Sequence, residues 1–450
     1  MSGRVMLRRA TSVAFVLALS FAVACGSSGG AASSQREGSG DAGAHDDAAS
    51  PAADASADGR ADASDAARDA ASADADGASP FALALPQVLS GGGASLAQPR
   101  IVPILYASDP MAAQIGQFLS ALASSSYWGQ ATGEYGVGAL SIAPTVVLPD
   151  PPAGTISDKQ IQALIASGIA ADGGAWPAPT AGTIYAYFPS DAVTVTMDGS
   201  GGATLVSCTN FGGYHSYVDL GHGSTTEYSV VARCSDYLGL GGIDFVTMAA
   251  THEFAEASTD PTGSGYAAVN LAGSGWAITA GGAEVGDLCK LDPTAPITPS
   301  DVGFLVQRIW SNAAATAGHD PCVPVPEGDA YVLGVPDVVQ TEIYPGQYVM
   351  GLSVPPGSTT TVNVHFYSDA PVAGTWTLEA TEPDVPQLQD PAHQLSFRFD
   401  RTQGQRGDVA QLAVTRAAAA PAAGLVTPAP FVITSTLGSV KHWYWGVVGN

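Results

Sequence analysis

Positive charge is scarce in this sequence. Its 450 residues include 16 Lys and Arg against 41 Asp and Glu, which gives a formal net charge of −25. A nucleic-acid-binding surface must be positive, so nucleic-acid binding is excluded as the main function. The same deficit argues against binding to anionic lipid headgroups and favours solubility or cation binding. Charged residues make up only 13%, whereas Gly (53) and Pro (31) are abundant. Turn-rich α/β or β structure is therefore expected, and long charged helices are not.

Long hydrophobic runs are also rare, and the first 25 residues hold the longest. Three arginines within the first nine residues precede an apolar or small stretch at 10–23, and Cys25 follows Ala24. This pattern is typical of a secretory signal peptide. The cysteine resembles that of a bacterial lipoprotein signal. The resemblance implies that Cys25 is lipidated and anchors the protein to the cell envelope, at the outer membrane or cell surface. An ordinary signal peptide containing a cysteine is the alternative.

Residues 26–80 lack aromatic side chains altogether. They consist almost entirely of Ala, Asp, Ser and Gly, with eleven acids against three arginines. Low hydrophobicity combined with like charge cannot offset the entropy lost on ordering the chain. The sequence therefore predicts a disordered tether over 26–80.

Cysteines are few: the sequence has five, and four remain when Cys25 is excluded. Cys208, Cys234, Cys289 and Cys322 in an exported protein predict two disulfides, for which three pairings exist. The sequential pairing, Cys208–Cys234 and Cys289–Cys322, is favoured. A four-cysteine zinc site is disfavoured because no pair has the close spacing of such sites.

The remaining chain predicts two folded units. The first, 81–325, is an α/β (α+β) domain whose expected strands and helices alternate along the chain. Strands are expected at 101–106, 146–148, 183–188, 193–197 and 227–233, and helices at 109–124, 157–170 and 244–259. The second unit, 326–450, follows a Pro-rich boundary. Alternating segments such as 361–366 and 394–399 predict an all-β, immunoglobulin-like sandwich.

The sequence THEFAEASTDP (251–261) carries the candidate chemistry. His252, Glu253 and Glu256 form an HExxE motif. The related HExxH motif of zinc peptidases places two metal ligands one helical turn apart and a general-base Glu beside the first. Composition predicts only about 0.004 chance matches to HExxE in this chain. We therefore interpret His252 and Glu256 as metal ligands and Glu253 as the catalytic base.

Helical spacing predicts which of these side chains are buried. An i, i+3, i+4, i+7 pattern places His252 and Glu256 on the core-facing stripe and Glu253 on the flank. A buried glutamate must be paired or must coordinate a metal. The alternative to a metal is therefore an ion pair of Glu256 with Arg308 or Arg233, beside a hydrogen-bonded core histidine.

A later segment, GGAEVGDLCK (281–290), offers further ligands. Glu284 is the third carboxylate that a His/Glu zinc site would use. Asp287 and Asp260 are candidates to hydrogen-bond the ligands and orient them. His215, in GGYHSY, is a further candidate of the same kind, although a histidine in an aromatic strand is more often structural. The alternative for Glu284 and Asp287 is a solvated turn near Cys289.

These motifs together resemble a known family. HEFAEASTDP, Gly275–Trp276, AEVGDLC and RIWSNAAATAGHDPC look like a bacterial group of secreted HExAExxTDP proteins. They are more distantly similar to the plant phosphate-induced, EXORDIUM-like family. The similarity covers about residues 95–325. It implies a secreted or wall-associated protein with a zincin-like helix. Residue by residue it carries over to His252, Glu253, Glu256, Asp260, Glu284 and Asp287.

Ligand chemistry leaves three functions open. Zinc is the preferred ion, but two carboxylate ligands weaken its Lewis acidity and also suit calcium or manganese. The first hypothesis is a peptidase-like, metal-dependent hydrolase. The second is a non-catalytic surface protein in which a metal or ion pair braces the fold. The third is an adhesion or carbohydrate-binding lipoprotein in which the C-terminal sandwich does the binding. The expected partners are the membrane, through Cys25, and a peptide or a cell-wall polysaccharide.

Overall fold

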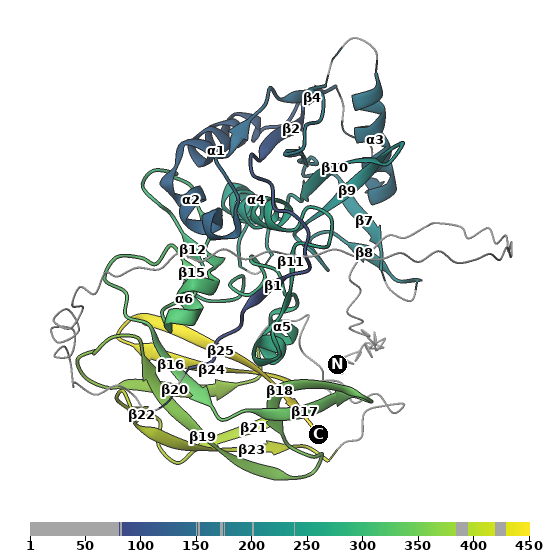
Figure 1. Cartoon of the computed structure of the whole chain (residues 1–450). Helices are drawn as coiled ribbons and strands as arrows, with labels where there is room; N and C mark the ends of the chain where they lie inside the picture. The colour runs from purple at the N-terminus through teal and green to yellow at the C-terminus, as the bar shows by residue number, and fades with distance from the viewer. Residues whose placement is uncertain are drawn as a thin grey trace, which may run out of the picture. The chain divides into compact units, whose positions relative to one another are not determined.

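The computed structural model describes residues 81–450, except 82, 150, 152–153, 172–173, 175, 200–201, 238, 384–394 and 419–428. The predicted signal peptide, Cys25 and the tether lie outside the described residues. The described chain belongs to one compact unit. It is a mixed α/β region followed by an all-β region (Figure 1), as the sequence predicts.

The first region is built on a six-stranded sheet of order β3-β2-β6-β10-β9, in which β4 also pairs with β2. Its strands are β2 (Arg100–Tyr106), β3 (Ser141–Ile142), β4 (Val146–Leu148), β6 (Thr183–Tyr187), β9 (Gly213–Gly221) and β10 (Ser224–Val231). Neighbouring strands are parallel, except that β9 runs antiparallel to β10 at one edge.

Both faces of this sheet are buried, which explains the unbroken apolar run of β2. Ile101 and Leu105 face the core that contains helices α1 (Ala112–Ser124), α2 (Ser126–Thr132) and α4 (Gly242–Thr259). Val102 and Ile104 face the opposite core, which contains helix α3 (Asp158–Ala170). Alternate residues of a strand point to opposite faces, so one run of six residues supplies both cores.

Smaller elements complete the α/β region. The predicted serine cap is present, because Ser157 and Gln160 form a reciprocal capping box at the start of α3. The other elements are β1 (Val88–Ser90), η1 (Gly133–Tyr135), β5 (Thr155–Ser157), β7 (Thr194–Asp198), β8 (Thr204–Val206), β11 (Tyr266–Val269), η3 (Leu271–Gly273), α5 (Ser274–Ala280), β12 (Pro296–Ile297), β13 (Val306–Gln307), β14 (Ile309–Trp310), α6 (Asn312–Ala317) and β15 (Cys322–Val323).

The C-terminal region is sandwich-like, with one four-stranded and one six-stranded sheet. The four strands are β16 (Val332–Pro336), β19 (Thr359–Ser368), β23 (Val409–Arg416) and β21 (Leu395–Phe399). The six are β17 (Val339–Tyr344), β18 (Gln347–Ser353), β25 (Val440–Gly449), β24 (Ala429–Leu437), β20 (Trp376–Thr381) and β22 (Gln403–Gly404). The predicted strands at 361–366 and 394–399 correspond to β19 and β21. The narrower immunoglobulin-like assignment stays a prediction.

Helix α5 connects the two regions. The Thr279 hydroxyl donates to the Gly446 carbonyl of β25 at 2.7 Å, and the Met350 amide of β18 donates to the Ser274 hydroxyl at 2.9 Å. The Trp276 ring lies edge-on to Tyr444. The chain leaves α5 directly into the 281–290 segment, so the sandwich supports the start of that segment. None of the described helices is long and apolar enough to cross a membrane.

Candidate metal centre

Helix α4 carries the HExxE motif through the interior of the α/β region. Val246 and Phe254 are fully buried, and so are side chains on most of the helix circumference, as is typical of a core helix. Glu253, predicted to lie on the flank of the core-facing stripe, is itself buried and only 5% exposed. His252, placed on the core-facing stripe, is only partly buried. The helix is covered by the sheet on one side and by the 284–310 segment on another, so a single inward stripe does not describe it.

His252 and Glu256 lie one turn apart, as the motif predicts. The distance from His252 Nε2 to Glu256 Oε2 is 3.1 Å, and the Glu256 side chain is 6% exposed. Glu256 also accepts a hydrogen bond at 3.1 Å from the backbone amide of Asp287. Burial, followed by repulsion from Asp287, Glu284 and Glu253, raises the pKa of Glu256 well above its ordinary value.

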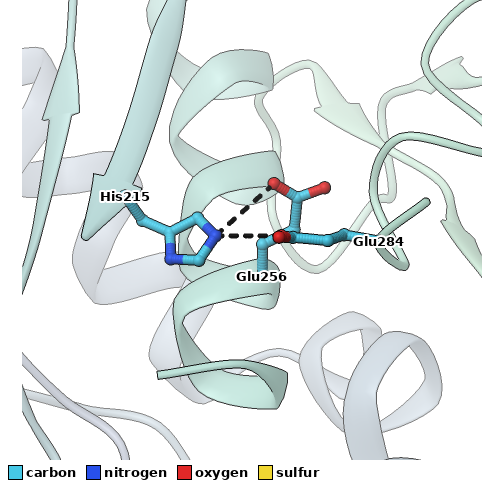
Figure 2. Close-up of side chains that lie close together, drawn as sticks. All are labelled: His215, Glu256 and Glu284. Carbon is cyan, nitrogen blue, oxygen red and sulfur yellow. Dashed lines mark hydrogen bonds and ion pairs between the residues drawn. The ribbon is translucent and has the colours of Figure 1, made fainter. Parts of the chain in front are cut away.

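His215 reaches the same carboxylate from strand β9. Its Cα partner across the sheet is Ser229, so the two side chains share the face of the sheet toward α4. The distance from His215 Nε2 to Glu284 Oε2 is 2.9 Å, and that to Glu256 Oε2 is 3.9 Å (Figure 2). Although burial disfavours its cation, the nearby Glu284, Glu256 and Glu253 charges raise the pKa of His215 to about 10. The structure thus brings His215 among the candidate ligands.

The 281–290 segment lies against α4. Asp287 Oδ1 lies 3.9 Å from His252 Nε2 and accepts a hydrogen bond from the Lys290 ammonium at 2.7 Å. Lys290 and His252 outweigh the effect of burial and lower the pKa of Asp287. The close approach requires glycine at 286, because a Cβ there would lie 2.7 Å from His252 Nδ1 and 2.8 Å from Glu256 Oε1.

Gln307 sets the orientation of the His252 ring. Its Nε2 donates to the Gly286 carbonyl at 2.7 Å, and its Oε1 lies 3.1 Å from His252 Nδ1. Because a carbonyl only accepts, the amide nitrogen must face Gly286, and the oxygen must therefore accept from Nδ1–H. In the neutral ring this leaves the Nε2 lone pair directed toward the carboxylates. Such a partner on the far nitrogen is typical of metal-ligating histidines.

The predicted ligands fall into two overlapping groups. His215, Glu256 and Glu284 form one, and His252, Glu256 and Asp287 form the other, with the ligand atoms of each group within 4.8 Å of one another. The predicted trio of His252, Glu256 and Glu284 is therefore divided between the groups, and Glu256 is common to both. Asp287 is predicted to support the ligands from outside. Its carboxylate instead lies close enough to His252 and Glu256 to bind the same ion.

Asp260 lies outside both groups. It caps the end of α4, where its Oδ1 accepts a hydrogen bond from the Gly265 amide at 2.5 Å. Burial raises its pKa, and the Glu284 charge raises it further. Asp260 therefore turns the chain after the helix and adds negative charge to the surroundings of the ligands.

Glu253 packs against strand β9. A Cβ at Gly213 would come within 2.7 Å of Glu253 Oε1, so glycine there makes room for the carboxyl group. Burial raises the pKa of Glu253 to about 7, although His252 and His215 oppose that effect. A carboxyl group with a pKa near neutrality is suited to general-base catalysis.

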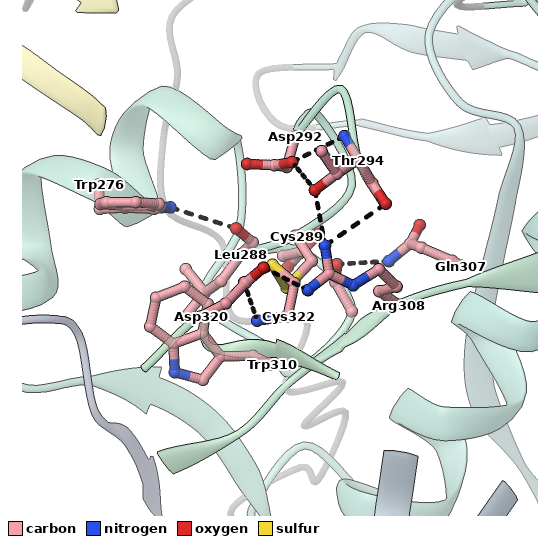
Figure 3. The surroundings of a disulfide bond; sticks show 12 residues. Trp276, Leu288, Cys289, Asp292, Thr294, Gln307, Arg308, Trp310, Asp320 and Cys322 are labelled. Carbon is pink, nitrogen blue, oxygen red and sulfur yellow. Dashed lines mark hydrogen bonds and ion pairs between the residues drawn. A yellow bond between two sulfur atoms is a disulfide. The ribbon is translucent and has the colours of Figure 1, made fainter. Parts of the chain in front are cut away.

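The alternative to a metal, an ion pair of Glu256 with Arg308 or Arg233, is wrong. Arg308 instead donates to Asp320 at 2.5 Å and to Thr294 (Figure 3). It also donates to the Pro324 carbonyl. Arg233 pairs with Asp109. Both arginines are buried with other partners, so neither balances the charge of Glu256.

Two disulfides brace the segments that carry the ligands. Cys208–Cys234 and Cys289–Cys322 are the favoured sequential pairs. In the first disulfide, Cys208 lies just before strand β9 and Cys234 lies just before helix α4. The second ties the 281–290 segment to β15, directly beside the Arg308–Asp320 pair (Figure 3).

Sequence reasoning missed three residues of this centre: Gln307, Lys290 as the partner of Asp287, and Glu227. Glu227 lies on β10, on the face toward α4, and burial raises its pKa to about 8. Gln307 is 55 positions from His252, and no local pattern connects them. Only the scarcity of glutamate between 81 and 325 could have drawn attention to Glu227.

Comparisons with known proteins assign no family. No protein-family model matches the chain, and no curated protein matches it. Among solved structures, the chain is similar to one described as "Structure of Titin M4 trigonal form", with 12% identity, 26% of this chain and 97% of that chain covered, and a TM-score of 0.14. A similarity at that score carries no argument about fold or function.

Proposed function

We propose that this protein is a metal-dependent hydrolase whose centre is built around Glu256. The observation that carries the proposal is the convergence of two histidine nitrogens and three carboxylates with little compensating positive charge. In the described part of the chain, the lysine and arginine salt bridges of these carboxylates are limited to Lys290–Asp287. A bound cation would supply the missing charge, because buried carboxylates need pairing or coordination.

The donor set fits a divalent ion. Imidazole nitrogen with carboxylate oxygen suits zinc, and the high carboxylate content also suits manganese. His252 would bind through Nε2, since Gln307 holds its Nδ1 proton. A divalent ion held here would act as a Lewis acid toward a carbonyl substrate.

Glu253 is the residue we assign as general base. Its pKa near 7 allows it to accept a proton from the attacking water as the new C–O bond forms, and to return that proton to the leaving amine as the C–N bond breaks. Peptides are the favoured substrates because β9, which carries His215, is an edge strand of its sheet. An edge strand can pair with an extended peptide through main-chain hydrogen bonds.

The competing function is a non-catalytic metal site that braces the fold. Its support is the burial of Glu253 and Glu256, which are 5% and 4% exposed. A peptide-library cleavage assay of wild type, Glu253→Gln and the surface control Asp198→Asn separates the two. Hydrolysis predicts that Glu253→Gln retains metal but loses about 10²–10⁴-fold in rate, whereas Asp198→Asn is unchanged. Cleavage that survives both Glu253→Gln and a chelator would eliminate the metallohydrolase; no cleavage by metal-loaded wild type would favour the brace.

We also propose that the protein acts outside the cytoplasm, anchored through Cys25. Two disulfides support an oxidising compartment. Cys25→Ser should move the protein from the membrane fraction to the soluble fraction. An unchanged membrane fraction would contradict the anchor without affecting the metal site.

A further inference from the structure

One feature of the centre is unexplained by a single ion: its ligands form two groups that meet at Glu256. His215 and Glu284 form one group with Glu256, and His252 and Asp287 form the other. The two histidines belong to different groups. Glu256 Oε2 lies 3.1 Å from His252 Nε2 and 3.9 Å from His215 Nε2. The same oxygen thus faces both groups.

The spacing within each group matches ligands of one ion. Two ligands at about 2.1 Å from a tetrahedral ion lie about 3.4 Å apart. In the first group His215 Nε2 lies 2.9 Å from Glu284 Oε2 and 3.9 Å from Glu256 Oε2. In the second, His252 Nε2 lies 3.1 Å from Glu256 Oε2 and 3.9 Å from Asp287 Oδ1. In each group, one of these distances is shorter and the other longer than the expected separation.

We propose that the centre binds two divalent cations bridged by Glu256. The first is held by His215 and Glu284, and the second by His252 and Asp287. The inference rests on the proposed metal-dependent function and deepens it, because paired ions that share a bridging group are a recognised arrangement for hydrolysis.

Lys290 makes the two positions unequal. Its ammonium lies 2.7 Å from Asp287 Oδ1, the oxygen that faces His252. A cation bound between Asp287 and His252 is repelled by this charge, whereas the His215–Glu284 position has no lysine or arginine salt bridge among the described residues. The ions therefore bind in sequence, and Lys290→Met strengthens the second binding step.

Metal stoichiometry of the full-length protein tests the proposal. After equilibration with Zn²⁺ and removal of free metal, native mass spectrometry of wild type should show two ions per chain. Glu284→Gln and Asp287→Asn should each retain one ion, Glu256→Gln should lose both, and Asp198→Asn should retain two. One ion in wild type, unaltered by Asp287→Asn, overturns the pair but leaves the hydrolase proposal standing. No bound ion overturns both.

A measurement on wild type alone guards against variants that fail to fold. Mn²⁺-loaded protein should give the exchange-coupled multiline EPR spectrum of two neighbouring ions. The six-line spectrum of isolated Mn²⁺ at saturation would overturn the pair.

Discussion

Two buried charged clusters lie in the α/β region, and the difference between them distinguishes a structural ion pair from a binding site. In the first, Arg308 and Asp320 are 0% and 5% exposed, and each charge meets an opposite charge and hydrogen-bond partners. In the second, Glu256 is buried just as deeply, yet its neighbours are other carboxylates and histidines. A balanced buried pair needs nothing further from solution. An unbalanced cluster must take up protons or bind cations.

The largest expected effect breaks the balanced cluster. Arg308→Met should destabilise the protein by about 3–5 kcal/mol, because Asp320 is left buried without its partner. Denaturant unfolding measures the loss. The double variant Arg308→Met/Asp320→Leu should recover much of it, since no charge is then stranded. No recovery of stability in the double variant would show that Arg308 acts through packing and not through charge.

The next effect concerns the unbalanced cluster. A divalent ion at 100 times its dissociation constant should stabilise wild type by about 2.7 kcal/mol, because it binds only the folded state. Thermal unfolding with and without chelator measures the difference. Glu256→Gln should abolish it, whereas Arg308→Met should keep it. If chelator leaves the thermal unfolding of wild type unchanged, the Glu256 cluster binds no stabilising ion and does not differ from the Arg308–Asp320 cluster in its need for one.

A smaller effect is expected on metal affinity when Gln307, which orients His252, is replaced. Gln307→Ala removes the acceptor that orients His252 and should weaken metal binding about 10–100-fold. Isothermal titration with Zn²⁺ measures the change. Gln411→Ala, an exposed glutamine on strand β23, is the matched control. Equal affinities for the two variants would contradict the orienting role of Gln307.

The smallest effect depends on pH. The pKa of Glu227 rises from 4.5 to about 8 on folding because the group is buried. Between these values the unfolded chain has lost the proton that the folded chain retains, so the free energy of unfolding decreases as pH rises and then levels off. In chelator-treated protein, Glu227→Gln should remove this contribution. Parallel pH profiles for variant and wild type would contradict the raised pKa.

Local patterns in the sequence determined much of the framework. The apolar run at 101–106 predicted strand β2, the serine cap predicted the start of α3, and the 244–259 pattern predicted α4. The HExxE spacing placed His252 and Glu256 one turn apart. Periodicity and capping act over a few residues, so one sequence is enough to recognise them.

Only the tertiary structure decided how the site is completed. The register of β9 on β10 turns His215 toward α4, and the 281–290 segment brings Asp287 to His252. The pairing of Arg308 with Asp320 leaves Glu256 without an arginine, a choice that composition left open. The β9–β10 register is set locally by a short hairpin turn. The packing of that hairpin against α4, the approach of Asp287 and the pairing of Arg308 depend instead on contacts between segments far apart in sequence, which no local pattern encodes.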